Sequence, residues 1–220
     1  GTSIYDLKKK TFEIPKIPNY SPEYEAHCIQ YVEYDNSWWI GTSNGLVRYH
    51  EDNLSLRHLY HIENVEQTLP DNNLRCMHRV DDTMIFIGTS DGLCLLNAVD
   101  QTLNRIDLNA LTNYRSPKTD VSKIISLDEN KIMVSTYTDG LYIYDYKENI
   151  AIHISKFDKR DAISDNYIFD VFKDVNGSVW IATFTGLNRF ENNLNPTSRN
   201  RSSLQSRQKA ITPRARTSAG

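Results

Sequence analysis

Four copies of one short phrase recur along this chain at a constant spacing. Each copy has a β-branched residue, a small residue, a threonine, a short polar stretch and then Gly-Leu. The threonines are Thr42, Thr89, Thr136 and Thr183, so successive copies lie 47 residues apart, and the third copy holds one extra residue before its glycine. A fixed period of this length indicates a repeat architecture. The repeated positions are Gly41, Thr42, Gly45, Gly88, Thr89, Gly92, Thr136, Gly140, Thr183 and Gly186.

Around each phrase the sequence predicts the same series of short strands separated by polar turns. The first strands are expected at 28–34, 74–80, 121–127 and 167–172, and the second at 38–40, 84–87, 132–134 and 179–181. The third strands are expected at 46–49, 93–96, 141–144 and 187–190, and the fourth at 54–59, 102–108 and 150–155. Between the second and third strands stand Asn-Gly, Asp-Gly, Asp-Gly and Thr-Gly, which favour hairpins because glycine accepts a positive φ.

Four antiparallel strands per repeat of 47 residues predict an all-β fold, a β-propeller of four-stranded blades. Stacking buries the face of each blade against its neighbour, and this explains the small residue before each threonine (Gly41, Gly88, Ser135 and Ala182), because two sheets approach closely there. We also expect the threonine hydroxyl to form a hydrogen bond across the turn.

The two ends of the chain differ from the repeat. Residues 4–14 resemble the stretch that begins Ile143-Tyr144-Asp145, and so predict a strand, a turn and a second strand; a Pro-containing connector follows at Pro15–Pro22. Whole blades are expected at 26–60, 73–108 and 121–156, and the blade begun at Tyr167 lacks a fourth strand. Either residues 4–14 complete it and close a four-bladed ring, or the chain is an excerpt of a larger propeller. We favour the excerpt, with blades in 1–195 and a basic, Ser/Arg-rich tail in 196–220 that is either a disordered, solvated end or not native to the fold.

Charge is unevenly distributed between the blades and the tail. Of the 25 basic residues, six lie in 196–220, which has no acidic residue, and the rest of the chain therefore carries 19 basic against 28 acidic residues. An acidic body does not attract phosphate backbones, so nucleic acid is not expected as a partner. No apolar run of about 18 residues predicts a membrane span. The six basic residues are Arg199, Arg201, Arg207, Lys209, Arg214 and Arg216.

No arrangement of residues predicts catalysis, a metal or a cofactor. Cys28 and Cys76 fall in apolar strand patterns, where a small buried thiol is the usual explanation, and Cys94 leaves the number odd. His58 and His61 would lie on opposite faces of a strand, which argues against a shared metal ion. The paired acids Asp81-Asp82 and Asp128-Glu129 stand at expected turns, as solvated turn residues do.

The phrase resembles the repeat of the two-component regulator propellers, whose core is Trp-Ile-Gly-Thr…Gly-Leu followed by an aromatic residue. Trp39–Tyr49 carries this core, and Val179–Phe190 is nearly as similar, after an acidic-Gly turn at Asp174–Gly177. The resemblance covers residues 4–191. The sequence departs from the family pattern at Ser135 and Ala182, where the family prefers glycine, and at 84–86, which lacks the tryptophan.

This resemblance implies an extracytoplasmic sensor. Proteins of the family place paired seven-bladed propellers on the outer side of hybrid histidine kinase–response regulators of Bacteroides-like bacteria, and many of them detect glycans. For this chain the resemblance implies a periplasmic location as part of an inner-membrane sensor, an oligosaccharide ligand, and neighbouring blades or a kinase dimer partner in the full-length protein. Nothing in the sequence resembles the kinase itself. Alternatives are a protein-interaction scaffold and, less favoured, an enzyme similar to the streptogramin lyases.

Two residues break the repeat at the turn after the threonine. Tyr137 and Phe184 stand where the other copies have Ser43 and Ser90. An aromatic side chain at the tip of a loop is suited to stacking on a sugar ring or on a partner side chain. The alternative is that both rings pack beneath the loop of a neighbouring blade. On the first hypothesis, Tyr137 and Phe184 are the candidate ligand-binding residues; Asn73, Arg75, Lys118 and Asn166 are expected near the same face.

Overall fold

The computed structural model describes residues 3–13, 24–50, 52–53, 55–159 and 162–191, and the regular secondary structure in them is almost entirely β-strand. The predicted tail and the Pro-containing connector lie outside the described residues. The strands are β1 (Ile4–Asp6), β2 (Thr11–Glu13), β3 (Ala26–Val32), β4 (Ser37–Thr42), β5 (Gly45–His50), β6 (Ser55–Leu59), β7 (Leu74–Arg79), β8 (Met84–Thr89), β9 (Gly92–Asn97), β10 (Thr102–Ile106), β11 (Val121–Ser126), β12 (Lys131–Thr136), β13 (Leu141–Asp145), β14 (Ile150–Ile154), β15 (Ile168–Lys173), β16 (Ser178–Thr183) and β17 (Gly186–Glu191). One α-helix, α1 (Leu108–Thr112), and one 3-10 helix, η1 (Glu33–Asp35), accompany them.

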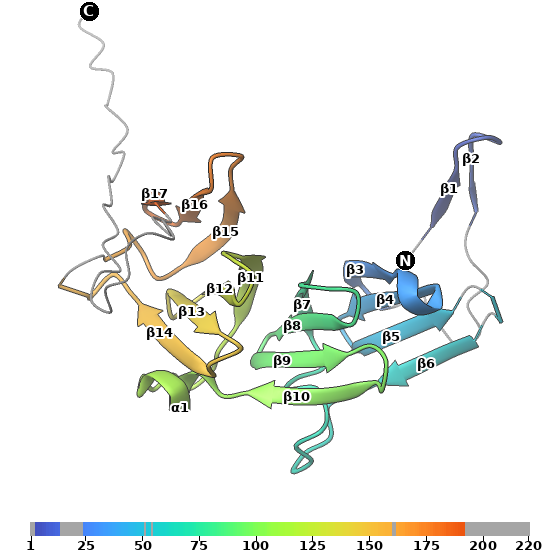
Figure 1. Ribbon diagram of the computed structural model, residues 1–220, viewed down its shortest axis with the longest axis horizontal. Helices are drawn as coiled ribbons and strands as arrows, with labels where there is room; N and C mark the ends of the chain where they lie inside the picture. The colour runs from blue at the N-terminus through green and yellow to red at the C-terminus, as the bar shows by residue number, and fades with distance from the viewer. Residues whose placement is uncertain (1–2, 14–23, 51, 54, 160–161, 192–220) are drawn as a thin grey trace, which may run out of the picture. The chain divides into compact units, whose positions relative to one another are not determined.

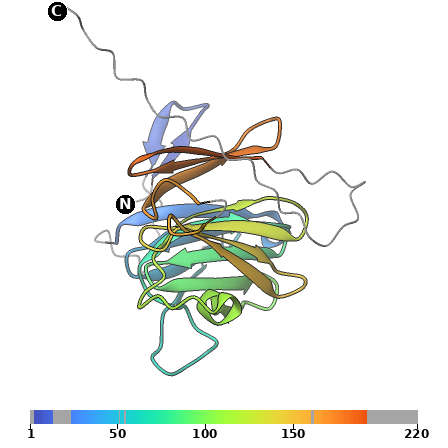
Figure 2. The same ribbon diagram turned by 90° about the vertical axis from the view of Figure 1, so that its left-hand side faces the viewer.

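The strands form antiparallel sheets in which sequence neighbours pair (Figure 1). We call β3–β6 blade 1, β7–β10 blade 2, β11–β14 blade 3 and β15–β17 blade 4 (Figure 2). Blades 1 to 3 have four strands each, and blade 4 has three among the described residues. The predicted all-β fold with four-stranded units is therefore confirmed. The chain divides into two compact units, residues 1–108 with 116–124 and residues 109–115 with 125–220, and each is described by itself.

The N-terminal hairpin has the form of the outer half of a blade. β1 pairs with β2 so that Asp6 faces Thr11, as Asp145 faces Ile150 in blade 3. Each of these hairpins, and that of β9 and β10, has a left-handed residue directly before its second strand, with φ of 55° at Lys10, 58° at Gln101 and 54° at Asn149. The similarity noted between the two sequences thus extends to register and turn. Among the described residues, β1 and β2 pair only with each other.

Two predicted strands, the first strand of blade 1 and the fourth of blade 2, end two residues earlier than expected. β3 stops at Val32, because the chain turns into η1 and then into a left-handed conformation at Asn36, with φ of 51°. β10 stops at Ile106, and Leu108, which was expected to end this strand, begins α1 instead. A helix of five residues is too short to show helical periodicity in the sequence.

The repeated threonine closes the turn between the second and third strands, as predicted. In all four copies its Oγ1 donates a hydrogen bond to the carbonyl of the turn glycine, at 2.8 Å from Thr42, 3.0 Å from Thr89, 2.8 Å from Thr136 and 2.8 Å from Thr183. In each turn the same oxygen also accepts a backbone N–H. The glycines of the first three copies have positive φ, at 102°, 125° and 81°, as expected; Gly186 does not.

The small residue before the threonine marks a close approach between sheets. A Cβ added to Gly41 would lie 3.1 Å from the Cβ of Leu74 on β7, and one added to Gly88 would lie 2.4 Å from Cγ1 of Val121 on β11. The predicted reason for a small side chain is thus confirmed at these two glycines. A backbone hydrogen bond accompanies each contact. The N–H of the turn glycine donates to a carbonyl two residues before the next first strand, from Gly45 to Asn72 at 2.6 Å and from Gly92 to Thr119 at 2.8 Å.

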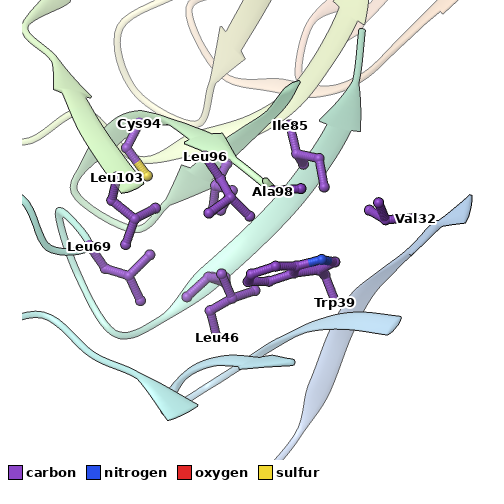
Figure 3. Close-up of a cluster of buried hydrophobic side chains, with 11 residues drawn as sticks. Val32, Trp39, Leu46, Leu69, Ile85, Cys94, Leu96, Ala98 and Leu103 are labelled. Atoms are coloured by element: carbon purple, nitrogen blue, oxygen red, sulfur yellow. The ribbon is translucent and has the colours of Figure 1, made fainter. Parts of the chain in front are cut away.

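Each unit has its own hydrophobic core. In the first unit, Trp39 and Leu46 of blade 1 face Ile85 and Leu96 of blade 2, and all four are almost completely buried (Figure 3). Val32, Leu69, Cys94, Ala98 and Leu103 complete the labelled cluster. In the second unit the core combines residues of blades 3 and 4. They are Leu127, Met133, Leu141, Ile143, Ile163, Ile168, Val171, Val179, Ile181 and Phe190.

Candidate functional site

The candidate residues Tyr137 and Phe184 belong to one aromatic cluster in the second unit. Its centre is Tyr167, whose ring lies 5.3 Å from that of Tyr137, 5.0 Å from that of Phe169 and 6.4 Å from that of Phe184, measured between centroids. The rings of Phe169 and Phe184 are also 6.4 Å apart. We call Tyr137, Tyr167, Phe169 and Phe184 the aromatic cluster.

Three rings of the aromatic cluster are largely accessible to solvent. The exposed fraction is 72% for Phe184, 52% for Phe169 and 40% for Tyr167, and Tyr137 is half-buried. Phe184 therefore does not pack beneath a loop among the described residues. Folding normally removes such large apolar rings from water, and a contiguous exposed group of them is typical of a contact surface.

A β-bulge gives the aromatic cluster its orientation. β15 pairs with β16 through Ile168 and Asp170, and the register shifts between them at Phe169. The side chain of Ile168 is completely buried in the core, whereas Tyr167 and Phe169 on either side of it face solvent. Bulges of this kind redirect a side chain at the edge of a ligand site.

Hydrogen bonds hold the backbone on both sides of the aromatic cluster. The amide of Phe184 donates to the carbonyl of Tyr167 at 3.0 Å, and Thr185 Oγ1 donates to the carbonyl of Ser164 at 2.9 Å. Asp165 Oδ1 accepts the amide of Tyr167 at 2.9 Å. The rings are thus carried by a backbone that is fixed before any ligand arrives, which reduces the entropy lost on binding.

Sequence reasoning missed Tyr167 and Phe169. Their equivalents one repeat earlier are Asp120 and Ser122, so aromatic residues replace polar ones at both positions. A comparison of the first strands at the 47-residue spacing would have found this signal. Arg75, another residue expected near this face, is occupied by a two-pronged contact with Asp120, at 3.0 and 3.1 Å.

Two of the remaining predicted polar residues, Asn166 and Lys118, have structural contacts. Asn166 Oδ1 accepts the amide of Lys156 at 2.8 Å, and Lys118 donates its amide to Ser116 Oγ at 3.3 Å. The Oδ1 of Asn73 is buried without a hydrogen-bond partner. None of these contacts assigns a chemical role to the side chain.

The paired acids build turns. Asp81 Oδ1 accepts the amides of Thr83 and Met84, each at 2.8 Å, and Asp128 Oδ1 accepts those of Asn130 and Lys131, each at 2.8 Å. Burial raises the pKa of the Asp81 carboxyl, but these hydrogen bonds outweigh it, and the pKa lies below its ordinary value. The Asp81 carboxylate, held ionised in this way, caps its turn.

The argument about His58 and His61 was wrong, because β6 ends at Leu59 and His61 lies outside the strand. His58 Nδ1 is 2.6 Å from the Tyr60 hydroxyl, while His61 Nδ1 is 2.7 Å from the Leu69 carbonyl. In the described part of the chain, no three His, Cys, Asp or Glu side chains are placed to hold a metal ion. Cys28, Cys76 and Cys94 are free, Cys28 partly and the other two fully buried.

Antiparallel meanders of four strands that recur every 47 residues define the chain as a β-propeller protein. Residues 162–185 match the family model described as two component regulator propeller. No curated protein sequence matches the chain. No helix among the described residues is long and apolar enough to cross a membrane.

Solved structures share the fold at low sequence identity. The extracellular domain of BT3049 from B. thetaiotaomicron, assigned as a hybrid two component system, is 19% identical with a TM-score of 0.65, over 84% of this chain and 25% of that domain. The extracellular domain of BT4673 from B. thetaiotaomicron, assigned as a one component system, is 16% identical with a TM-score of 0.63, over 79% of this chain and 24% of that domain. The β-propeller domain of Cps50 (Swd1) from Myceliophteria thermophila is 10% identical with a TM-score of 0.61, over 94% of this chain and 64% of that domain. This chain thus spans about a quarter of the first two domains.

Proposed function

We propose that this chain is the ligand-sensing part of an extracytoplasmic sensor in a hybrid two-component signalling protein, located in the periplasm. The family match at residues 162–185 supports the proposal, as does the similarity of fold to extracellular domains that belong to two-component systems. In such a protein the propeller binds a ligand and performs no catalysis. A histidine kinase elsewhere in the full-length protein would catalyse the phosphorylation. Ligand binding by the propeller would be transmitted to this kinase and to its dimer partner.

The ligand that we propose is a glycan, and the observation that carries this proposal is the exposed aromatic cluster. A sugar ring has an apolar face of C–H groups and an equatorial rim of hydroxyls. Flat aromatic rings bury the apolar face while the hydroxyls keep their contact with water. Four rings with neighbouring centroids 5.0–6.4 Å apart offer a continuous surface, which is wide enough for more than one sugar unit.

The test is titration of an oligosaccharide panel against the 220-residue chain and against the double variant Tyr137→Ala/Phe184→Ala, by calorimetry. Each aromatic contact contributes about 0.5–1.5 kcal/mol beyond its burial, so removal of two rings should weaken binding by about tenfold or more. The matched control is Phe157→Ala, because Phe157 is 76% exposed and lies outside the aromatic cluster. Phe157→Ala should leave the affinity unchanged.

Two outcomes contradict this proposal. Equal affinity of the double variant and the parent chain would remove the aromatic cluster as the binding site. Absence of binding by every oligosaccharide, together with capture of a partner domain that depends on Tyr137 and Phe184, would favour the alternative of a protein-interaction scaffold.

A further inference from the structure

A hollow lies in the same unit as the aromatic cluster, between the outer strand β14 and α1 with the residues that follow it. Its volume is about 440 Å³, and it shares no residue with the aromatic cluster. Ligand sites in proteins commonly measure roughly 300–1,000 Å³. Its walls include Leu111, Asn113, Tyr114, Ile152, His153 and Asp158. We call this hollow the α1–β14 groove.

One wall of the groove is an ordered stack of rings. Tyr114 lies face to face with His153, with 3.8 Å between ring centroids and 22° between ring planes. His153 also contacts Tyr142, with 4.8 Å between ring centroids, and the Tyr142 hydroxyl donates to Asn109 Oδ1 at 3.1 Å, at the start of α1. The stack thus fixes the short helix against β14, and the groove is a built feature of the fold.

The orientation of His153 determines what it presents to a ligand. Its Nε2 is 2.5 Å from the backbone carbonyl of Asp139, and a carbonyl oxygen can only accept a hydrogen bond. Nε2 therefore carries a proton. In the neutral imidazole the proton is then absent from Nδ1, which is left as a hydrogen-bond acceptor.

Asp158 supplies a second acceptor. Its Oδ2 receives the amide of Ser155 at 2.5 Å and the Ser155 hydroxyl at 3.1 Å, so the carboxylate is held in place by one oxygen. The other oxygen, Oδ1, has no hydrogen bond to the described residues. The Tyr114 hydroxyl keeps its proton at neutral pH, since burial and the nearby charge of Asp139 raise its pKa.

We propose that the α1–β14 groove binds a second ligand, an uncharged sugar unit. The groove combines acceptors for hydroxyl groups, at His153 and Asp158, with the apolar side chains of Leu111 and Ile152 for the C–H face of the ring. Its wall has one carboxylate and no lysine or arginine, which disfavours an acidic sugar. This proposal goes beyond the glycan site at the aromatic cluster and does not depend on it.

The experiment is an NMR titration of the ¹⁵N-labelled 220-residue chain with methyl glycosides of glucose, galactose, mannose and xylose. We expect one of them to bind in the millimolar range and to shift the amide signals of residues 111–114 and 151–153. Ile152→Trp fills the groove and should abolish the shifts. Ile150→Trp is its matched control, because Ile150 is exposed on the same strand and lies outside the groove. Asp158→Asn should weaken binding about tenfold, the usual effect of losing a hydrogen bond to a charged group.

The outcomes separate this proposal from the proposed glycan site. No shift with any of the four glycosides, or shifts that persist in Ile152→Trp, would overturn the groove. So would selective binding of N-acetyl-lysine methylamide, a cationic probe, because the groove would then recognise a basic side chain. Shifts confined to residues 137, 167, 169 and 184 would remove the groove and leave the aromatic cluster. Shifts confined to the groove would do the reverse.

Discussion

Replacement of Gly88 by alanine should destabilise the first unit, because there is no room for a methyl group between Gly88 on β8 and Val121 on β11. A Cβ at Gly88 would lie 2.4 Å from Cγ1 and 2.8 Å from Cβ of Val121, and 2.8 Å from Sγ of Cys76. Carbon atoms in contact lie about 3.5–4.0 Å apart. The distance from the added Cβ to Cγ1 of Val121 would therefore be too short by roughly 1.1 Å or more. Val121 is completely buried, and its β-branched side chain has few rotamers with which to move away.

The magnitude follows from two opposing effects. Overpacking of a rigid core costs about 1–3 kcal/mol. Alanine also reduces the entropy of the unfolded chain, which stabilises the folded state by about 0.4–1 kcal/mol where the backbone conformation suits alanine. Gly88 meets this condition because its φ is not positive. The net loss in the free energy of unfolding should therefore be about 1–2 kcal/mol. Gly186→Ala is the matched control, because its Cβ would be no closer than 3.4 Å to another atom and its φ is also not positive.

Urea unfolding of the three chains measures this difference, with hydrogen exchange of the β8 amides as a local readout. Gly88→Ala should unfold at lower urea than the parent, and Gly186→Ala within about 0.5 kcal/mol of it. Adding Val121→Ala to Gly88→Ala should cost less than the sum of the single changes by about 1 kcal/mol, because the added methyl then meets a smaller neighbour. Equal stability of the two alanine variants, or strict additivity in the double variant, would refute the close approach as the reason for this glycine.

Three further predictions test other parts of the fold. Thr89→Val should cost about 1–2 kcal/mol of unfolding free energy because two turn hydrogen bonds are lost, and Thr89→Ser should restore most of it in the same urea assay. A double-mutant cycle with Arg75→Lys and Asp120→Asn should give a coupling of about 0.5–1 kcal/mol that falls at high salt, since the pair is partly exposed. Burial raises the pKa of Cys28 to about 12 and that of Cys94 to about 12. Native thiols should therefore label slowly with iodoacetamide at pH 8, and stability should fall as the pH rises above about 8.5, where unfolded thiols ionise first; fast labelling of the native chain would contradict this.

The sequence was sufficient to predict the blades, because the features that define a blade are local and repeated. A threonine and a glycine three or four residues apart build the turn by bonding to each other, so Thr42 and Gly45 carry the information in the sequence itself. Helix α1 could not be predicted in this way. Its five residues occupy a single connection, and what holds it is a distant contact, the Tyr142 hydroxyl on Asn109. Contacts of this kind leave no periodic signal.

The candidate site was predicted in part, and the missing half shows why. Tyr137 and Phe184 were found because they interrupt the motif itself. Tyr167 and Phe169 stand in the less regular first strand, where the bulge at Phe169 also breaks the alternation that a strand should show. Their proximity to Tyr137 arises from packing of blade 4 on blade 3, which a turn motif does not describe.

The 47-residue period separates what the fold requires from what a site can change. The turn-glycine N–H donates to the carbonyl two residues before the next first strand, at Asn72, at Thr119 and again at Asn166, so the backbone arrangement is the same at all three. Directly after these residues the side chains differ. Asp120 pairs with Arg75, whereas Tyr167, one repeat later, lies among three other aromatic rings. Because the backbone bonds maintain the fold without help from these side chains, the positions are free to hold an ion pair in one place and an exposed ligand surface in another.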